Sequence, residues 1–358
     1  MKYIVVLICM LLITTVLPVS GNVFMERTSK PTFTGNTLYV GGSGPGNYSS
    51  IQIAIDSADD GDSIFVYDDS SPYYENVVID KSVNLIGENK QTTIIDGCKN
   101  GDVVKIIANQ VDINGFTIKN SSYYPYRGAG INIESDDNII SDNIILNNGE
   151  YGLCIHDSNN CWILRNTITG NNHGVSIPDS SQILVEDNFI QGNRYTGIGV
   201  YRDILGTKIM NNIIMDSRKG VYIFNCHFGV NIKFNIISEN DKGIAIHAGS
   251  KLCTISENII NSNSEYGIAV YLSEGNLIYK NNFEDNGENA YIEFYRSFGI
   301  NKWNLLLKGN YWDDWDGSGL KIIHGKMYLT LGREKDISIP WINIDWFPAK
   351  EPYDIPAV

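Results

Sequence analysis

The sequence has few basic residues for its length. Its 358 residues include 27 Lys or Arg against 41 Asp or Glu, which gives a net charge of −14. Nucleic-acid binding requires a surface rich in Lys and Arg, so this balance argues against a nucleic-acid partner. The five cysteines that follow residue 21 form no CxxC and no Cys/His zinc spacing, and we interpret them as small buried thiols: Cys98, Cys154, Cys161, Cys226 and Cys253.

Long apolar runs are also absent, with one exception at the N-terminus. Met1-Lys2-Tyr3 is followed by an uncharged run, 4–17, and then by small residues up to Gly21. This order is typical of a secretory signal peptide, which we place at 1–21. The run is shorter than the ~20 residues that span a bilayer, although a retained anchor is the alternative. We therefore expect a secreted or cell-surface protein with no membrane span once the signal is removed.

What the sequence does contain is a repeat of 22–24 residues. It shows as two ladders of identical residues that share one period. The glycine ladder is Gly130, Gly152, Gly174, Gly197, Gly220, Gly243 and Gly267, and the asparagine ladder is Asn143, Asn166, Asn188, Asn212, Asn235, Asn258 and Asn282.

Aliphatic residues keep register with the asparagine ladder, as Ile140 and Ile145 do around Asn143 and Ile163 and Ile168 do around Asn166. Stacked β-branched columns separated by Asp, Asn, Ser and Gly turns predict an all-β fold, a right-handed parallel β-helix with three strands per coil. We expect about 11 coils. A leucine-rich repeat lacks support because Ile replaces Leu and no copy has helical periodicity.

The two ends depart from the repeat, as the caps of a solenoid must. Within 22–60, apolar residues at i, i+3, i+4 and i+7 from Ile51 predict a short capping helix. The repeats occupy 61–300, and their pattern decays after Asn282, where Glu284 stands in place of a core Ile. A Trp- and Pro-rich segment, 301–358, follows, which we interpret as an aromatic lid over the last coil or as a platform on which sugars stack.

The fourth residue after each ladder glycine is expected to point outward. Neighbours in this column lie about 4.8 Å apart, one coil from the next. Five of the seven are aromatic or His, which predicts a groove that binds polysaccharide; the alternative is that the rings only stabilise the outer surface by stacking. The column is Glu134, His156, Pro178, Tyr201, Phe224, His247 and Tyr271.

Acidic residues gather just beyond this column. Asp136, Asp157 and Asp179 come from successive coils, so their carboxylates are candidates for one Ca²⁺ site. Solvated turns are the alternative, because Asp is a common turn residue.

One stretch, 151–157, has the residues for acid–base chemistry. Proton abstraction beside a uronate carboxyl needs a base, an acid and a cation that neutralises the carboxylate. His156, Tyr201 (or Tyr151) and Arg202 are the candidates for these roles. An idle, exposed His156 is the alternative. We count Glu134, Tyr151, Phe224, His247 and Tyr271 as the candidate substrate-binding residues.

The entry stretch, with Ser50-Ile51-Gln52-Ile53-Ala54-Ile55 and Asp60-Gly61-Asp62-Ser63-Ile64, resembles the NosD-like family of parallel β-helix proteins. So does Gly309-Asn310-Tyr311-Trp312-Asp313-Asp314-Trp315 near the end. The resemblance implies a pectin-lyase-like fold with carbohydrate-binding and sugar-hydrolase relatives. Uronate C5-epimerases of the same fold use Tyr-Gly-x-Asp-Pro-His; Tyr151, Gly152 and His156 match, whereas Cys154-Ile155 replaces Asp-Pro.

Three functions remain open from the sequence. The first is binding of extracellular or cell-envelope polysaccharide through the outward column. The second is an enzyme of lyase, epimerase or glycosidase type that uses the same face. The third is a structural surface protein with no catalytic activity.

Overall fold

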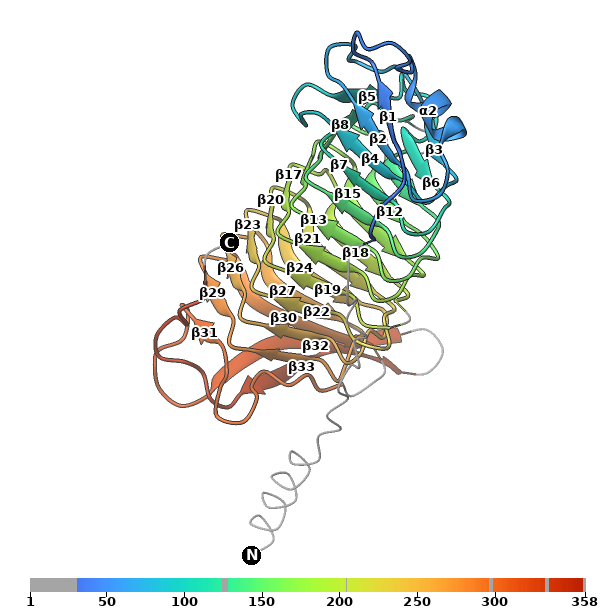
Figure 1. The fold of residues 1–358 in the computed structure, drawn as a ribbon. Coiled ribbons are helices and arrows are strands. Elements are labelled where there is room, and N and C mark those ends of the chain that lie inside the picture. The colour runs from blue at the N-terminus through green and yellow to red at the C-terminus, as the bar shows by residue number, and fades with distance from the viewer. Residues whose placement is uncertain (1–30, 124–127, 204, 296–298, 332–334, 357–358) are drawn as a thin grey trace, which may run out of the picture.

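The computed structural model describes residues 31–123, 128–203, 205–295, 299–331 and 335–356. The expected signal peptide, 1–21, lies outside these residues. The chain winds into a solenoid in which each coil contributes one strand to each of three sheets, and the parallel β-helix predicted from the repeat is confirmed (Figure 1). The boundaries proposed for the N-terminal segment, the repeats and the C-terminal segment stay a prediction. Strand β1 lies before residue 60, where the repeats were expected to begin, and it already pairs with β2 in the first sheet.

The first sheet has eleven strands within the described residues, all parallel. In spatial order they are β1 (Thr37–Val40), β2 (Ser63–Val66), β4 (Asn84–Gly87), β7 (Asp112–Asn114), β10 (Ile139–Ser141), β13 (Trp162–Leu164), β16 (Leu184–Glu186), β19 (Lys208–Met210), β22 (Asn231–Lys233), β25 (Thr254–Ser256) and β28 (Leu277–Tyr279).

The second sheet has ten strands in the part of the chain described. They are β5 (Ile94–Asp96), β8 (Thr117–Lys119), β11 (Ile144–Leu146), β14 (Thr167–Thr169), β17 (Phe189–Gln191), β20 (Ile213–Met215), β23 (Ile236–Ser238), β26 (Ile259–Asn261), β29 (Asn282–Glu284) and β31 (Tyr311–Trp312).

The third sheet has the longest strands and ends in an antiparallel pair, β32 with β33. Its described strands are β3 (Val77–Ile79), β6 (Val104–Ile106), β9 (Ala129–Ile133), β12 (Tyr151–Ile155), β15 (His173–Pro178), β18 (Thr196–Tyr201), β21 (Lys219–Phe224), β24 (Lys242–His247), β27 (Tyr266–Tyr271), β30 (Glu288–Tyr295), β32 (Lys321–Leu331) and β33 (Lys335–Asp345).

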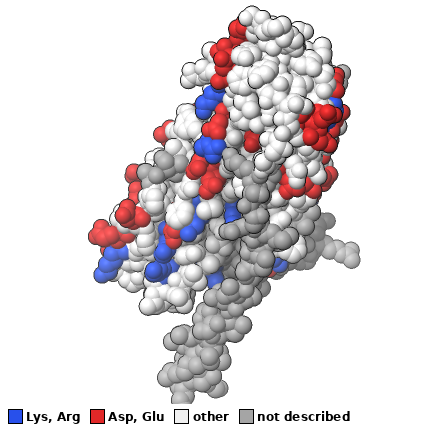
Figure 2. Space-filling model, in the orientation of Figure 1, with Lys and Arg blue, Asp and Glu red and all other residues white. Residues whose placement is uncertain are grey.

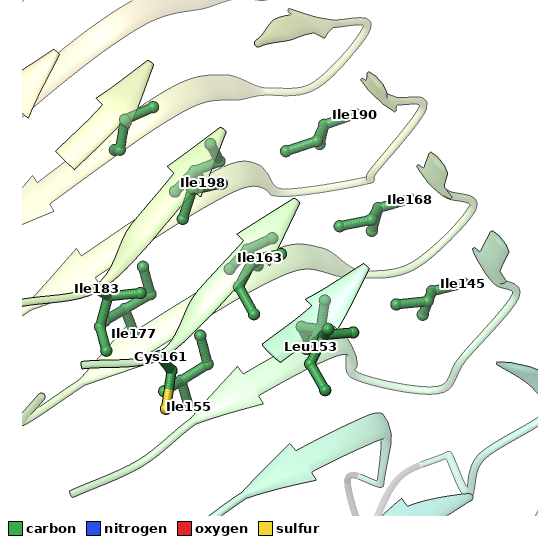
Figure 3. Packing of buried hydrophobic residues seen from close by; sticks show 14 of the residues in the cluster. Ile145, Leu153, Ile155, Cys161, Ile163, Ile168, Ile177, Ile183, Ile190 and Ile198 are labelled. Carbon is green, nitrogen blue, oxygen red and sulfur yellow. The ribbon is translucent and has the colours of Figure 1, made fainter. Parts of the chain in front are cut away.

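Aliphatic columns fill the interior between the sheets. Ile145, Ile168 and Ile190 lie one above another on successive coils, and each is fully buried (Figure 3). Cys161 lies in the core beside these columns, and Cys226 and Cys253 are buried as well, as predicted for the thiols. The prediction is wrong for Cys98, which is exposed, and for Cys154, which is only partly buried because it points outward from β12.

The asparagine ladder closes the turn between the first and second sheets. The Oδ1 atom of Asn188 accepts hydrogen bonds from the backbone N–H and the Nδ2 of Asn166, at 2.9 and 3.1 Å. The Nδ2 of Asn188 donates to the carbonyl of Ile163 at 2.8 Å and to Oδ1 of Asn212 at 3.0 Å. Each buried Asn therefore pairs polar backbone groups that water cannot reach.

The ladder glycines are required by close approach rather than by an unusual φ. A Cβ placed on Gly197 would lie 2.7 Å from the carbonyl oxygen of Gly220, one coil further on, and 2.6 Å from a methyl of Ile214. Glycine thus lets the third sheet bend toward the core at the start of each strand.

Two details of the predicted repeat are wrong at its C-terminal end. The ladder runs through Asn281, which bonds Asn258, and reaches Asn310, whose Oδ1 accepts from the backbone N–H and the Nδ2 of Asn281. Asn282 instead starts β29 and bonds the backbone of Tyr353. The core position accordingly belongs to Phe283, which is fully buried, and the pattern does not fail at Glu284. Asn281 and Asn282 both fall within the repeat spacing, and the choice of Asn282 shifted the register by one residue.

Both ends of the core are capped. Helix α2 (Ile51–Ser57) covers the first coil as predicted; Ser50 caps it, and the Glu75 carboxylate accepts from the backbone N–H groups of Ile51 and Gln52. At the other end Trp303 and Trp312 are buried, and Trp312 stacks on Phe283 at 4.5 Å between ring centroids. These two tryptophans form the lid of the last coil.

Candidate functional site

The outer surface of the third sheet carries three outward columns, which we call together the third-sheet face. The predicted column lies where expected, since Tyr201, Phe224 and His247 pair directly across β18, β21 and β24. A second column lies two residues before it, and a third just ahead of the ladder glycine. From β15 to β30 the second column is Ser176, Gly199, Tyr222, Ala245, Ala269 and Tyr291, and the third is His173, Thr196, Lys219, Lys242, Tyr266 and Glu288.

Side-chain rings form a continuous layer along this face. Centroid distances are 5.7 Å from Tyr201 to Tyr222, 5.2 Å from Tyr222 to His247 and 4.3 Å from His247 to Tyr271. The layer ends at Tyr291, 6.0 Å from Tyr271. All five rings are partly exposed, so the layer offers ring faces and edges to a ligand.

The layer exists because small residues separate the large ones in the second column: Gly199 precedes Tyr222, and Ala245 and Ala269 lie between Tyr222 and Tyr291. Gly199 leaves space that the ring of Tyr201 fills, since a Cβ on Gly199 would lie 2.6 Å from the Tyr201 hydroxyl. Ala245 and Ala269 are likewise fully covered. Sequence reasoning missed Tyr222 and Tyr291, although the alternation of Gly or Ala with Tyr at this repeat position was a visible signal.

Two lysines border the rings. The Nζ of Lys219 lies 4.0 Å from the centroid of the Tyr222 ring. Burial, then Arg218 and Lys242, lowers the pKa of Lys219. Lys242 pairs with Glu265 on the next coil, whereas no ion pair of Lys219 is found among the described residues. The sequence reasoning did not select either lysine.

His247 lies between these lysines and the tyrosines. Its Nε2 is buried and has no hydrogen-bond partner in the described part of the chain. Burial, with the nearby charges of Lys219 and Lys242, lowers the pKa of His247 to about 4. The imidazole is therefore neutral at pH 7.

The three residues predicted for acid–base chemistry do not meet at one point. His156 and Tyr201 belong to coils two apart, roughly 10 Å along the axis. Burial, followed by Tyr222, raises the pKa of Tyr201, so its phenol keeps its proton. Arg202 Nε donates to Oδ1 of Asp179 at 2.6 Å, and a second nitrogen of Arg202 donates to Oδ2. Arg202 is thus engaged by a carboxylate of the protein itself.

The predicted metal ligands are partly brought together. His156, Asp157 and Asp179 offer ligand atoms that lie within 4.8 Å of one another, while Asp136 accepts hydrogen bonds from the backbone and amide nitrogens of Asn159. Ca²⁺ takes six to eight oxygen ligands. One imidazole and two carboxylates, one of them neutralised by an arginine, do not fit that ion.

The remaining predicted residues lie at the N-terminal half of the face. Glu134 forms an ion pair of 3.0 Å with Lys105. Tyr151 packs on His173 at 5.5 Å, and His173 packs on Tyr195 at 5.6 Å, which makes a shorter second run of rings. Phe224 packs against Tyr222 at 6.1 Å and is 37% exposed.

An open pocket of about 510 Å³ adjoins the face at the turns that precede β18, β21 and β24. Arg194, Tyr195 and Arg218 line it together with the carboxylates of Asp216, Glu239 and Asp241. Basic and acidic side chains also run together along one border of the molecule in the view of Figure 2. The pocket extends the ring-bearing surface around the corner of the solenoid.

These features define a parallel β-helix protein with a ring-bearing, partly cationic outer face. The family model described as "Periplasmic copper-binding protein (NosD)" matches residues 32–225 and 109–317, and the chain belongs to this family. The resemblance to NosD-like proteins expected from the sequence is confirmed.

Similar solved structures share the fold at low sequence identity. The complex of XylC with xylose is 10% identical, covers 80% of this chain and 87% of that chain, and has a TM-score of 0.56. Pectate lyase Pel9A is 15% identical over 81% of this chain and 84% of its own, with a TM-score of 0.47. The A-module of the Azotobacter vinelandii mannuronan C-5 epimerase AlgE6 is 14% identical over 71% and 93%, with a TM-score of 0.46.

No curated protein matches the chain by sequence. Within the described residues α2 is the one helix, seven residues long, so no helix there has the length and apolar character needed to cross a membrane.

Proposed function

We propose that the protein binds an extracellular or cell-envelope polysaccharide along the third-sheet face. The observation that carries this proposal is the layer of five partly exposed rings from Tyr201 to Tyr291. The C–H faces of sugar rings pack on aromatic faces, and the polar tips of Tyr and His supply hydrogen bonds at the same surface. A linear polymer laid along the solenoid axis would meet one ring about every 4.8 Å.

The location follows the same proposal. The family is described as periplasmic, and the N-terminal apolar run is typical of an export signal. An extracytoplasmic protein has access to such polymers.

An enzyme acting on the same polymer is the second candidate, and one observation favours it. His247 is neutral at pH 7, lies beside protonated tyrosines and has two cations nearby, which is the set needed to abstract a proton next to a carboxylate. His156, Tyr201 and Arg202 remain the set predicted from sequence, and substitution tests both. Loss of turnover in His247→Ala but not in His156→Ala would assign the base to His247.

Binding is tested first, on a broad polysaccharide array with and without Ca²⁺. We expect one polymer class to bind, and we expect Tyr201→Ala and Phe224→Ala to lose binding while Tyr279→Ala, on the outer face of the first sheet, keeps it. Silence across the array overturns the proposal and leaves a structural role. Equal loss in all three variants would also contradict a site on the third-sheet face. Calcium dependence would assign a role to Asp136, Asp157 and Asp179 despite the arginine on Asp179.

A further inference from the structure

Two lysines and a tyrosine ring lie together on one part of the third-sheet face. Lys219 and Lys242 are direct neighbours across β21 and β24. Tyr222 lies between Lys219, at 4.0 Å, and His247, at 5.2 Å. The four side chains therefore belong to one small area that spans two coils.

This arrangement is unfavourable for the protein alone. Like charges directly opposite each other on paired strands destabilise a sheet. Lys242 is compensated by Glu265, but Lys219 is half-buried and no carboxylate of the described chain pairs with it. A buried imidazole nitrogen without a partner adds a further cost.

The composition makes this local excess of cations more significant. The chain has 41 acidic residues for 27 basic ones, so carboxylates to pair with Lys219 were available. Arg194 and Arg218 extend the basic character into the adjoining pocket. An anionic group bound between the two lysines would remove the repulsion and supply the missing partner.

We propose that the glycan is acidic and that one of its carboxylates binds at Lys219 beside Lys242, with its sugar ring against Tyr222. This inference rests on the proposed binding function and names its ligand class. The two ammonium groups donate hydrogen bonds to the carboxylate oxygens. Sulfate esters of sugars share this chemistry, and the test separates them from carboxylates.

The test measures binding of the full chain to a polyuronate, to the same polymer with its carboxyl groups reduced to alcohols, and to a sulfated neutral polymer, by calorimetry at low salt. We expect the polyuronate to bind at least about tenfold more tightly than its reduced form, the range expected for hydrogen bonds to a charged group. Lys219→Met keeps the apolar stem and should weaken polyuronate binding about tenfold. It should leave the weak binding of the reduced polymer unchanged.

One control accompanies this variant. Lys350→Met removes an exposed lysine outside the third-sheet face and should not change affinity. Far-UV circular dichroism of each variant shows whether the solenoid is folded.

The outcomes separate this inference from the proposed function. Binding of the reduced polymer at equal or higher affinity overturns the acidic ligand but leaves polysaccharide binding standing. Preference for the sulfated polymer overturns the carboxylate assignment. An unchanged polyuronate affinity in Lys219→Met overturns the site itself, and absence of binding to any polymer overturns both proposals.

Discussion

Asn212→Ala should destabilise the solenoid strongly at a single internal coil. The Asn212 Oδ1 accepts from the backbone N–H and the amide of Asn188, both at 3.0 Å, and its Nδ2 donates to the carbonyls of Val185 and Met210 and to Oδ1 of Asn235. The substitution removes all five bonds and leaves the buried N–H of Asn188 without its acceptor. One unsatisfied buried group costs about 1–3 kcal/mol, so with the lost amide contacts we expect about 4 kcal/mol.

Urea unfolding measures this loss. Far-UV circular dichroism follows all coils, whereas tryptophan fluorescence follows the cap, where Trp303 and Trp312 are buried. Asn231→Ala is the control, because the Asn231 Oδ1, on the outer side of β22, is buried without a partner in the described chain and its removal breaks no hydrogen bond of that oxygen; we expect no loss of stability. A loss below about 1 kcal/mol in Asn212→Ala, or an equal loss in both variants, would refute the ladder as the reason for the buried asparagines.

Three further predictions concern other parts of the fold. The pKa of His247 is lowered from 6.5 to about 4, so the stability that its neutral form contributes is present above pH 6.5 and is lost as the pH falls toward 4. We expect this contribution to be about 1.5 kcal/mol after discounting for partial exposure. His247→Gln should abolish this pH dependence of the unfolding midpoint. Gly197→Ala should cost about 2–3 kcal/mol in urea unfolding, since its Cβ would lie 2.7 Å from the carbonyl of Gly220, and a change near zero would contradict the close approach. Arg202→Met frees Asp179 and should raise the affinity for Zn²⁺ about tenfold in calorimetric titration, whereas an unchanged affinity would show that the guanidinium does not block the cluster.

Most of the solenoid is predictable from the sequence because its determinants repeat. The columns of Ile145, Ile168 and Ile190 recur at one spacing, and the ladder asparagines recur with them. A residue that must satisfy the same contacts in each coil shows as a period, so fold and register follow from counting. The predicted register was wrong at Asn281 and Asn282, since two adjacent asparagines fit the period equally well.

The site is less predictable because it depends on side-chain direction between coils. The sequence shows that Tyr201, Phe224 and His247 share a column, and the structure confirms it. The sequence does not show that the side chain of Lys219 reaches along β21 to the ring of Tyr222. Such contacts are set by rotamers and by the space that neighbouring residues leave, neither of which repeats from coil to coil.

The distribution of rings argues that the layer does more than stabilise the solenoid. Every coil must hold its three sheets together, so a need for outer stacking would act on all of them alike. Beyond the first coils, where Tyr39, Phe65 and Tyr67 meet, the described ring contacts on outer surfaces fall on the third sheet. The first sheet instead carries Lys208, Asn231 and Thr254 at its outer positions over the same coils. The concentration of rings and of the half-buried Lys219 on one sheet therefore supports the proposed ligand-binding role of the third-sheet face.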